Sequence, residues 1–328
     1  MDDSGDNKAR CGVSRRTVIK AGIGLAAAWH LGSVHAAEAN TLRIGYQKFN
    51  TLNILKGTGL LEKALQPHGI KVDWREFPGG SQLVEALYTG AIDVGHASDA
   101  VSVFQQATGK NLNYLAAESP YPGGIGLLVK ENSGITQVAQ LKGRRIGVGK
   151  GYNIQYALIR ALETHGLAYS DIEPVYIITA SDAVAAYQAG SVDAVGLWDP
   201  FLAGAQLVTS SRLLFDGTGL SNNRTFHLTR PDSIETHRVA LTLLFETLKQ
   251  TNQWAEQNPD KVVALLAPQL GIDPKILDLA TKRRRYGIVP LTPAIAEEQQ
   301  RMADTFLDLK LIPSKIDVLT LFNSSVVV

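Results

Sequence analysis

The sequence predicts an α/β protein with two similar lobes, each built on a parallel or mixed sheet, and a ligand cleft between the lobes. Segments 84–93 and 184–193 lie about a hundred residues apart and carry nearly the same pattern, and each ends in Asp. Arg43-Ile44-Gly45 precedes the first segment and Arg145-Ile146-Gly147 precedes the second, so the repeated unit includes a strand as well as a helix. Two similar α/β lobes leave a cleft between them, where ligands usually bind.

The first repeat alternates apolar strands with amphipathic helices. Pro67 and Gly69 close the first of these helices and Gly90 ends the next, since proline and glycine interrupt regular structure. We expect strands at 42–46, 70–74 and 92–96, and helices at 52–65, 81–88 and 99–108. Strands and helices that alternate at this spacing pair in parallel through right-handed crossovers.

The second repeat has the same order, and longer helical patterns follow it. We expect strands at 145–148, 175–178 and 192–197, and helices at 154–164 and 182–189. Further helices are expected at 236–252, 259–267, 274–282 and 293–309. These helices are expected to pack on the first lobe, which makes that lobe discontinuous. Residues 41–128 and 226–328 then form lobe 1, and residues 129–225 form lobe 2.

Length and composition are those of a globular protein of two domains. The chain has 328 residues, and 45% of them are hydrophobic, which is enough for two cores of ordinary size. Residues 1–36 hold five of the 32 Lys and Arg and three of the 31 Asp and Glu, so the rest of the chain has a formal net charge of −1. This charge argues against a nucleic-acid partner. The basic run Lys282-Arg283-Arg284-Arg285 is interpreted as a solvated helix end.

The N-terminal segment has the pattern of an export signal. Ser14-Arg15-Arg16-Thr17 contains a pair of arginines, and the apolar run of about a dozen residues after it is too short to span a bilayer. We interpret residues 1–36 as a twin-arginine signal peptide, with cleavage after Ala36 or Ala39, and we expect a soluble periplasmic protein. Cys11 is the only cysteine of the chain and leaves with the signal, so the mature protein has no thiol chemistry and no disulfide.

Several motifs together resemble one family of transport proteins. The motifs are Arg43-Ile44-Gly45-Tyr46-Gln47-Lys48, Phe77-Pro78-Gly79-Gly80, Glu85-Ala86-Leu87 with Gly90 and Ile92-Asp93, Leu141-Lys142-Gly143-Arg144, and Trp198-Asp199-Pro200-Phe201. Over almost the whole mature chain, the sequence resembles the solute-binding proteins of ABC importers for aliphatic sulfonates. Taurine- and nitrate-binding proteins are close relatives of that family.

The resemblance implies a function in transport and sulfur metabolism. It implies a monomeric, two-lobed periplasmic binding protein of type II that closes on a sulfonate or a related organosulfur anion, such as an alkanesulfonate, an arylsulfonate or a sulfate ester. The protein would deliver this ligand to an inner-membrane ABC permease with its ATPase. Binding of nitrate or another small anion is the alternative within the same class.

The chemistry of a sulfonate predicts the kind of site. A sulfonate is ionised at every physiological pH and offers only acceptor oxygens, so its pocket needs N–H and O–H donors. Helix N-termini supply such donors, and several of them at one cleft bind an anion without a buried lysine or arginine. The expected ligand-binding residues lie at or near the ends of strands, where helices begin: Gln47, Asn50, Thr51, Ser98, Asp99, Glu118, Tyr152, Asn153, Trp198 and Asp199.

Some residues of this set have more than one possible role. Ser98 is either a plain helix N-cap or a ligand contact, and Asp99 is either a cap or a residue that orients its neighbours. Trp198 is expected to form a wall of the cleft. A carboxylate at Glu118 or Asp199 would suit an amine or hydroxyl group on the ligand tail.

Two of the expected ligand loops depart from the family pattern. Loops 49–53 and 152–154 carry aromatic and amide side chains, where the family commonly has Gly and Ser. The exchange leaves room for a larger or aromatic ligand, including an arylsulfonate or a sulfate ester.

An enzyme is the alternative from another class. The same fold resembles proteins of thiamine-precursor synthesis and of a menaquinone pathway, and such an enzyme would act on a heterocyclic precursor. The chain has no His-Glu-x-x-His and no Gly-x-Ser-x-Gly motif, and its seven histidines show no metal-ligand spacing. His96 beside Asp99 is a candidate base. We expect a binding protein without catalytic residues, metal or cofactor.

Overall fold

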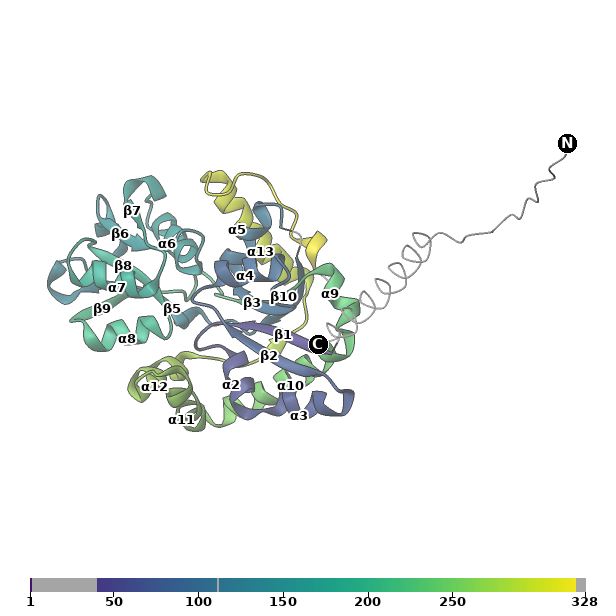
Figure 1. Cartoon of the computed structure of the whole chain (residues 1–328). Helices are drawn as coiled ribbons and strands as arrows, with labels where there is room; N and C mark the ends of the chain where they lie inside the picture. Colours follow the sequence, from purple (N-terminus) through teal and green to yellow (C-terminus); the bar gives the residue numbers. More distant parts are fainter. Residues whose placement is uncertain (2–39, 111, 323–328) are drawn as a thin grey trace. The chain divides into compact units, whose positions relative to one another are not determined.

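Two β-sheets, each flanked by helices, form the two lobes of the chain (Figure 1). The computed structural model describes residue 1 and residues 40–110 and 112–322. The described residues from Leu42 onward belong to one compact unit. The predicted twin-arginine signal at 1–36 therefore lies, apart from Met1, outside the described residues. Within the described part of the chain, no helix is long and apolar enough to cross a membrane.

Lobe 1 is built on a mixed six-stranded sheet with the order β11-β4-β10-β3-β1-β2. Its strands are β1 (Thr41–Tyr46), β2 (Lys71–Glu76), β3 (Val94–Ser98), β4 (Asn113–Glu118), β10 (Thr225–Thr229) and β11 (Ile288–Val289). β1 and β3 run parallel, whereas β10 runs antiparallel to both β3 and β4. The sheet is mixed because the chain returns to it, as β10 and β11, after it has built lobe 2.

Lobe 2 is built on a mixed five-stranded sheet with the order β7-β6-β8-β5-β9. Its strands are β5 (Ile125–Lys130), β6 (Arg145–Val148), β7 (Glu173–Tyr176), β8 (Ala194–Trp198) and β9 (Ser211–Asp216). β6 lies parallel to β7 and β8, and β5 lies antiparallel to β8 and β9. Because β5 pairs with β8 from Ile125 onward, the second sheet begins a few residues before the lobe boundary expected at residue 129.

Each of the repeated strands leads into a helix. The helices of lobe 1 are α2 (Thr51–Thr58), α3 (Leu60–Leu65), α4 (Gly80–Tyr88) and α5 (Asp99–Ala107), and those of lobe 2 are α6 (Asn153–Thr164), α7 (Ala180–Gln188) and α8 (Phe201–Val208). The single helix predicted at 52–65 is wrong, because Gly59 takes a φ of +65° and divides it into α2 and α3. β3 begins two residues later than predicted, since the backbone N–H groups of Ala91 and Ile92 still bond to Ala86 at the end of α4.

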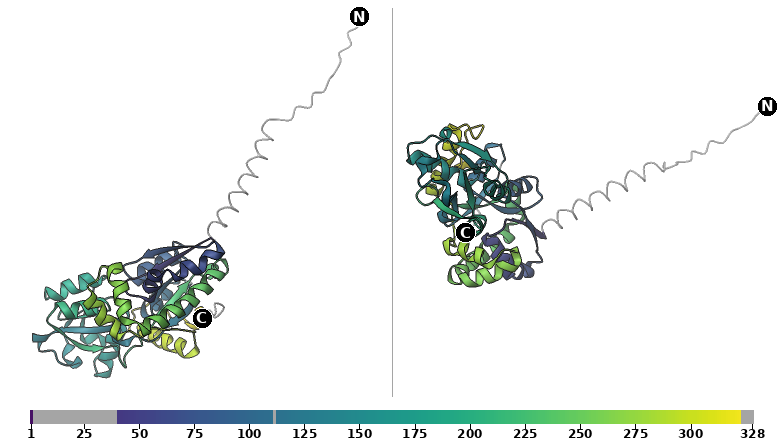
Figure 2. Two further views of the ribbon diagram at one scale, coloured as in Figure 1. Left: turned by 90° about the horizontal axis from the view of Figure 1, so that it is seen from below. Right: turned by 90° about the vertical axis from the view of Figure 1, so that its left-hand side faces the viewer.

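The C-terminal helices cover both lobes rather than lobe 1 alone. They are α9 (Pro231–Thr236), α10 (Arg238–Gln257), α11 (Pro259–Leu270), α12 (Pro274–Arg283) and α13 (Pro293–Asp308). α10 packs on α2 and α3, and α13 packs on α5, as expected. α12 also packs on α8 of lobe 2, which was not expected. Both views of Figure 2 show the green helices of this region against the purple and blue start of the described chain.

The chain crosses between the lobes in two segments that bond to each other. Residues 119–124 lead from β4 to β5, and residues 217–224 lead from β9 back to β10. The backbone N–H of Tyr121 donates to the carbonyl of Asn222 at 2.9 Å, and Asn223 Nδ2 donates to the carbonyl of Tyr121 at 2.6 Å. These paired crossings connect the lobes next to the cleft.

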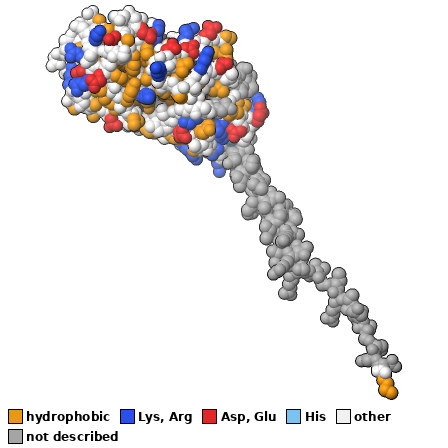
Figure 3. Space-filling view, turned by 90° about the horizontal axis from the view of Figure 1, so that it is seen from above, with side chains coloured by type: hydrophobic (Ala, Val, Ile, Leu, Met, Phe, Trp, Pro, Cys, Tyr) orange, Lys and Arg blue, Asp and Glu red, His pale blue; other side chains and the backbone are white. Residues whose placement is uncertain are grey.

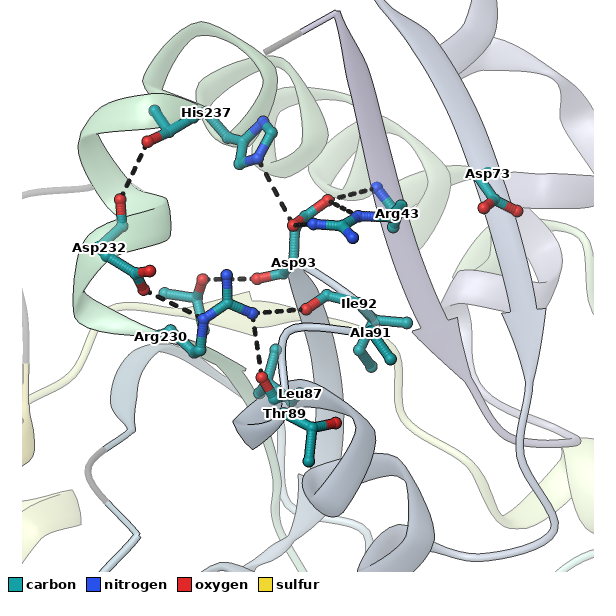
Figure 4. Close-up of polar contacts among 12 residues, drawn as sticks. Arg43, Asp73, Leu87, Thr89, Ala91, Ile92, Asp93, Arg230, Asp232 and His237 are labelled. Atoms are coloured by element: carbon teal, nitrogen blue, oxygen red, sulfur yellow. Dashed lines mark hydrogen bonds and ion pairs between the residues drawn. The ribbon is translucent and has the colours of Figure 1, made fainter. Parts of the chain in front are cut away.

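The repeated Arg and Asp of the two segments form the same contact in both lobes. Asp93 accepts hydrogen bonds from the backbone N–H of Arg43 at 2.8 Å and from its Nε at 2.9 Å, and His237 lies 3.5 Å away (Figure 4). In lobe 2, Asp193 accepts from the backbone N–H of Arg145 at 2.8 Å. In both lobes, therefore, an Arg near the start of one strand contacts the Asp that precedes the neighbouring parallel strand. These contacts lie at the end of the strands away from the cleft.

Charges of both signs are mixed over the surface. On the face shown in Figure 3, Lys and Arg side chains alternate with Asp and Glu side chains, and hydrophobic side chains lie between them. That face carries none of the continuous basic surface that a nucleic acid would require.

We predict that the two copies of the Arg–Asp contact differ in strength. The Asp93 side chain is 1% exposed, whereas that of Asp193 is 29% exposed. Asp93→Asn should lower the free energy of unfolding by about 3 kcal/mol, because it removes the buried carboxylate that accepts hydrogen bonds from the backbone and guanidinium of Arg43. Asp193→Asn is the matched control and should cost about 1 kcal/mol or less. Urea unfolding measures both values, and equal losses would contradict the interpretation.

Acid should weaken the Asp93 contact. Burial raises the pKa of Asp93, but hydrogen bonds from His237 and Arg43 outweigh burial and lower the pKa from 3.8 to about 2. A carboxyl with a lowered pKa stabilises the fold above its unfolded pKa and loses this contribution as the pH falls toward its folded pKa. We expect a loss of about 2 kcal/mol between about pH 5 and pH 2. Urea unfolding at several pH values should show a shallower fall for Asp93→Asn than for the natural chain, and parallel curves would refute this.

Candidate ligand-binding site

A cavity of about 530 Å³ lies between the lobes, where the repeated strands of both sheets end. Gln47 and Ser98 reach it from the ends of β1 and β3 in lobe 1, and Trp198 reaches it from the end of β8 in lobe 2. Its volume is in the range of pockets that hold a small organic molecule. The cavity therefore occupies the cleft that the sequence repeat predicts.

Six helices begin at this cavity, three from each lobe. Residues at the starts of α2, α4 and α5 in lobe 1, and of α6, α7 and α8 in lobe 2, line it: Asn50, Gly80, Ser98, Asn153, Ala180 and Phe201. The amino end of a helix carries a partial positive charge and unpaired backbone N–H groups, and each end stabilises a nearby anion by roughly 0.3 to 1 kcal/mol. Six such ends around one cavity favour an anionic ligand.

The start of α4 is the most open of the three in lobe 1. Asn50 caps α2 and Ser98 caps α5 with a side-chain oxygen, whereas Gly79 before α4 has no side chain to do so. A Cβ atom at Gly79 would lie 3.0 Å from Tyr152 Oη of lobe 2. Glycine at this position therefore leaves the backbone N–H groups of α4 accessible and lets Tyr152 approach from the opposite lobe.

Aromatic rings form the wall of the cavity in lobe 2. The rings of Tyr152 and Trp198 are stacked, with centroids 5.0 Å apart and planes 15° from parallel. Phe201 meets Trp198 edge to face at 5.7 Å. Trp198 lines the cavity, in keeping with its expected position as a cleft wall. A flat apolar group on a ligand has a matching surface here.

Arg284 brings a positive charge to the cavity, which corrects the interpretation of the basic run as a solvated helix end. α12 ends at Arg283, and Arg284 turns inward, is 8% exposed and lines the cavity. Its Nη2 donates to Glu118 Oε2 at 2.7 Å, and its Nη1 donates to the carbonyl of Phe49 at 3.3 Å. Burial lowers the pKa of Arg284, but Glu118 outweighs burial and raises it, so the guanidinium stays charged. The sequence predicts that helix N-termini bind the anion without a buried lysine or arginine, but the site contains a buried arginine.

Glu118 lies behind the cavity and holds several of its residues in place. Its carboxylate accepts a hydrogen bond from Asn50 Nδ2 at 3.3 Å as well as the bond from Arg284, and His227 Nε2 lies 3.4 Å away. Burial raises the pKa of Glu118, but Arg284 and His227 outweigh burial and lower the pKa to about 2. The carboxylate is therefore ionised and fixes both Arg284 and Asn50.

His96 serves as a neutral acceptor, not as a free base. Burial lowers its pKa from 6.5 to about 3, against the opposing effect of Glu118. Its Nε2 accepts a hydrogen bond from the backbone N–H of Gln47 at 3.1 Å, and Gln47 Nε2 donates to the carbonyl of His96 at 3.2 Å. The ring nitrogen that a base would use at this cavity is thus already bonded, and it positions Gln47.

The carboxylate of Asp199 is buried among protein partners. Tyr121 Oη donates to it at 2.6 Å, the backbone N–H of Ala203 donates at 3.1 Å, and Arg283 Nη1 lies 3.6 Å away. Burial raises the pKa of Asp199, while Arg283 and Tyr121 lower it. The expected carboxylate for an amine on the ligand tail is therefore not free at Asp199, nor at Glu118, which pairs with Arg284.

The structure brings most of the predicted ligand-binding residues together. Those that line the cavity are Gln47, Asn50, Ser98, Tyr152, Asn153, Trp198 and Asp199. Thr51, Asp99 and Glu118 do not line it, because each is buried behind the wall. Asp99 accepts from the backbone N–H groups of Ala100 and Arg224, so it acts as a local acceptor at the start of α5.

Arg284 and Tyr121 line the cavity without having been predicted. The sequence holds a weak signal for each. Arg284 stands four residues before Ile288, which pairs with Glu118 in β11 and so returns this segment to the sheet. Tyr121 stands between two prolines, in the segment that crosses from lobe 1 to lobe 2.

Metal ligands do not cluster in the described part of the chain. No group of three or more His, Cys, Asp or Glu residues among the described residues is placed to hold a metal ion. The side chains that line the site include the guanidinium of Arg284, the charged groups of Lys48 and Glu76, amides and aromatic rings.

Comparison with known proteins points to transport. The sequence model of one protein family, the substrate binding domain of ABC-type glycine betaine transport systems, matches residues 40–268. An aliphatic sulfonates-binding protein of Escherichia coli K12 is 38% identical over 287 residues, which cover 86% of this chain and 89% of the relative. The structure of the alkanesulfonate-binding protein SsuA from Xanthomonas axonopodis pv. citri, bound to MOPS, has a TM-score of 0.81 and 34% identity, and covers 87% of this chain and 98% of that one.

The fold is also found in an enzyme. The structure of the desulfurization enzyme DszB has a TM-score of 0.63 at 20% identity, and it covers 86% of this chain and 96% of that one. At this identity the similarity concerns the fold alone.

We predict that Glu118 stabilises the site through its charge. Glu118→Gln keeps the side-chain shape but leaves the buried guanidinium of Arg284 without an opposite charge, so the free energy of unfolding should fall by about 3 kcal/mol. Glu298→Gln is the control, since Glu298 pairs with Arg224 and its side chain is 23% exposed. This control should cost about 1 kcal/mol or less. Urea unfolding measures both, and a small loss at Glu118 would contradict the assigned role.

Proposed function

Because the chain belongs to the substrate-binding proteins of ABC-type transport systems, in the group of the aliphatic sulfonate-binding proteins, we propose that it binds a sulfonate in the cavity between its lobes. In this function it is the solute-binding component of an importer. The similar proteins from Escherichia coli and Xanthomonas are named for sulfonates, and this supports the same ligand class here.

The charged guanidinium of Arg284 at the cavity wall is the observation that carries the proposal. A sulfonate needs donors and a positive potential, and Arg284 adds both to the six helix ends. The carboxylates of Asp199, on the cavity wall, and of Glu118, behind it, are paired with arginines, and the third carboxylate, Glu76, lines the cavity with an exposed side chain. The potential in the cavity therefore suits a single negative charge.

The size and lining of the cavity favour an organic sulfonate over nitrate. Aromatic side chains make up much of the wall: Phe49, Phe77, Tyr121, Tyr152, Trp198 and Phe201. A small inorganic anion such as nitrate would leave most of about 530 Å³ unfilled. An arylsulfonate, or an alkanesulfonate with a bulky tail, would cover the stacked pair of Tyr152 and Trp198.

Binding is proposed to close the lobes around the ligand. The two crossing segments, 119–124 and 217–224, are the natural hinge, and donors from both lobes face the same cavity. A ligand held by both lobes stabilises the closed form over the open one. The closed monomer would then be recognised by an inner-membrane permease with its ATPase, after export to the periplasm through the twin-arginine signal around Arg15-Arg16.

We propose a receptor and not an enzyme. The similar proteins at more than 30% identity are named as binding proteins, and this supports a receptor. His96 Nε2 is bonded to the Gln47 N–H, which leaves the cavity without an available base at that position. A receptor returns its ligand unchanged, whereas an enzyme would deplete it.

A matched pair of ligands tests the proposed function. Benzenesulfonate at about 100 times its Kd should stabilise the folded chain by about 2.7 kcal/mol, seen as a rise in Tm, because it binds the folded state alone. Benzenesulfonamide has nearly the same shape without the charge and should produce no rise. Alkanesulfonates, taurine, sulfate and nitrate complete the panel. A response to nitrate alone would favour the small-anion alternative, and depletion of a ligand during incubation would favour an enzyme.

A further inference from the structure

The guanidinium of Arg284 lies among three aromatic rings that come from three separate segments. Its central carbon is 5.7 Å from the ring centre of Phe49, 5.2 Å from that of Tyr121 and 5.4 Å from that of Tyr286. Phe49 precedes α2, Tyr121 lies in the crossing segment after β4, and Tyr286 precedes β11. We call these three rings, together with Glu118, the aromatic box.

The aromatic box has the composition of a binding site for an organic cation. The faces of aromatic rings attract cations within about 6 Å, and the attraction grows when the cation is shielded from water. The Glu118 carboxylate, 2.7 Å from Arg284 Nη2, adds a full opposite charge. The carbonyl of Phe49 adds another acceptor, and Phe49 is held at a φ of +59°, a conformation that residues other than glycine rarely adopt.

The occupant of the box is part of the chain, and it faces the cavity. Arg284 lines the cavity, and its Nε has no hydrogen-bond partner among the described residues. The other two guanidinium nitrogens bond to Glu118 and Phe49. The two hydrogen bonds use two of the five N–H groups of the guanidinium, so the residue that fills the box still has donors to offer a ligand in the cavity it lines.

We propose that Arg284 determines the charge of the ligand, because its side chain occupies a cation site and turns that part of the cavity into an anion site. The inference rests on the proposed function for the identity of the anion, a sulfonate. The inference also makes a claim that does not depend on the proposed function. With the Arg284 side chain shortened to Ala, the three rings and Glu118 enclose a vacant site for a small organic cation such as methylguanidinium.

A merely structural role for Arg284 makes another prediction. If the arginine only neutralised Glu118 in the interior, its removal would weaken the fold, but an added cation would not restore anion binding. Recovery of sulfonate binding by a separate guanidinium compound requires that the box and the anion site share a boundary. This readout separates a specificity-determining residue from a structural ion pair.

The experiment compares Arg284→Ala with the natural full chain. In Arg284→Ala, affinity for benzenesulfonate should fall by about 100-fold, as expected for loss of a charged partner at a buried site. Millimolar methylguanidinium chloride should raise the Tm of Arg284→Ala, relative to the same concentration of sodium chloride, and should restore at least about 10-fold of the lost affinity. The natural chain should show neither effect, because its box is filled.

Arg285→Ala is the matched control. It removes the same charge from the adjacent residue, which is exposed. It should keep the natural affinity for benzenesulfonate and gain no response to methylguanidinium. The double variant Arg284→Ala with Glu118→Gln should lose the response to methylguanidinium, since the box then has no carboxylate.

Two further variants keep the test decisive if Arg284→Ala does not fold. Arg284→Lys should retain benzenesulfonate affinity within about 10-fold, and Arg284→Met, of similar length but uncharged, should lose it. Equal affinities of the Lys and Met variants would overturn the proposal, as would a folded Arg284→Ala that ignores methylguanidinium. If the natural chain bound no sulfonate but Arg284→Ala still bound methylguanidinium, the proposed function would fail while the assignment of the aromatic box would stand.

Discussion

The order of strands and helices is the constraint on which the cavity depends. A right-handed strand–helix unit places the start of its helix at the carboxyl end of its strand, and this chain contains such units in both lobes. Six helix starts are thereby brought to one cavity from opposite sides. The resulting positive potential is a property of the backbone, so it tolerates the aromatic and amide side chains that replace Gly and Ser in the loops.

Within each lobe, an Arg–Asp contact joins neighbouring strands at the ends that lie away from the cavity. Asp93 with Arg43, and Asp193 with Arg145, join the starts of parallel strands far from the cavity. The residues that shape the ligand site are anchored separately, through Glu118 to Arg284 and Asn50. The pattern that reveals the repeat therefore stabilises the sheets, while Glu118 and Arg284 lie outside the repeated segments.

Sequence reasoning reached the parts of the site that depend on local order. Gln47, Ser98 and Trp198 follow strands directly, so the alternation of elements was enough to predict that they meet at the cleft. Arg284 was missed, because its burial depends on β11 pairing with β4 across more than 160 residues of chain. The carboxylate of Asp199 was predicted to serve a ligand amine, yet Tyr121 and Arg283, from distant segments, already occupy it.

The position of a bound sulfonate tests the central claim most directly. A crystal structure of the chain with 4-bromobenzenesulfonate would locate the bromine and the sulfur by their anomalous scattering. The sulfonate oxygens should lie within hydrogen-bond distance of the Arg284 guanidinium and of backbone N–H groups at the helix starts, with the brominated ring against Tyr152 and Trp198. A sulfonate bound away from Arg284, or a ring that takes the place of the sulfonate beside it, would contradict the assignment of this cavity as an anion site.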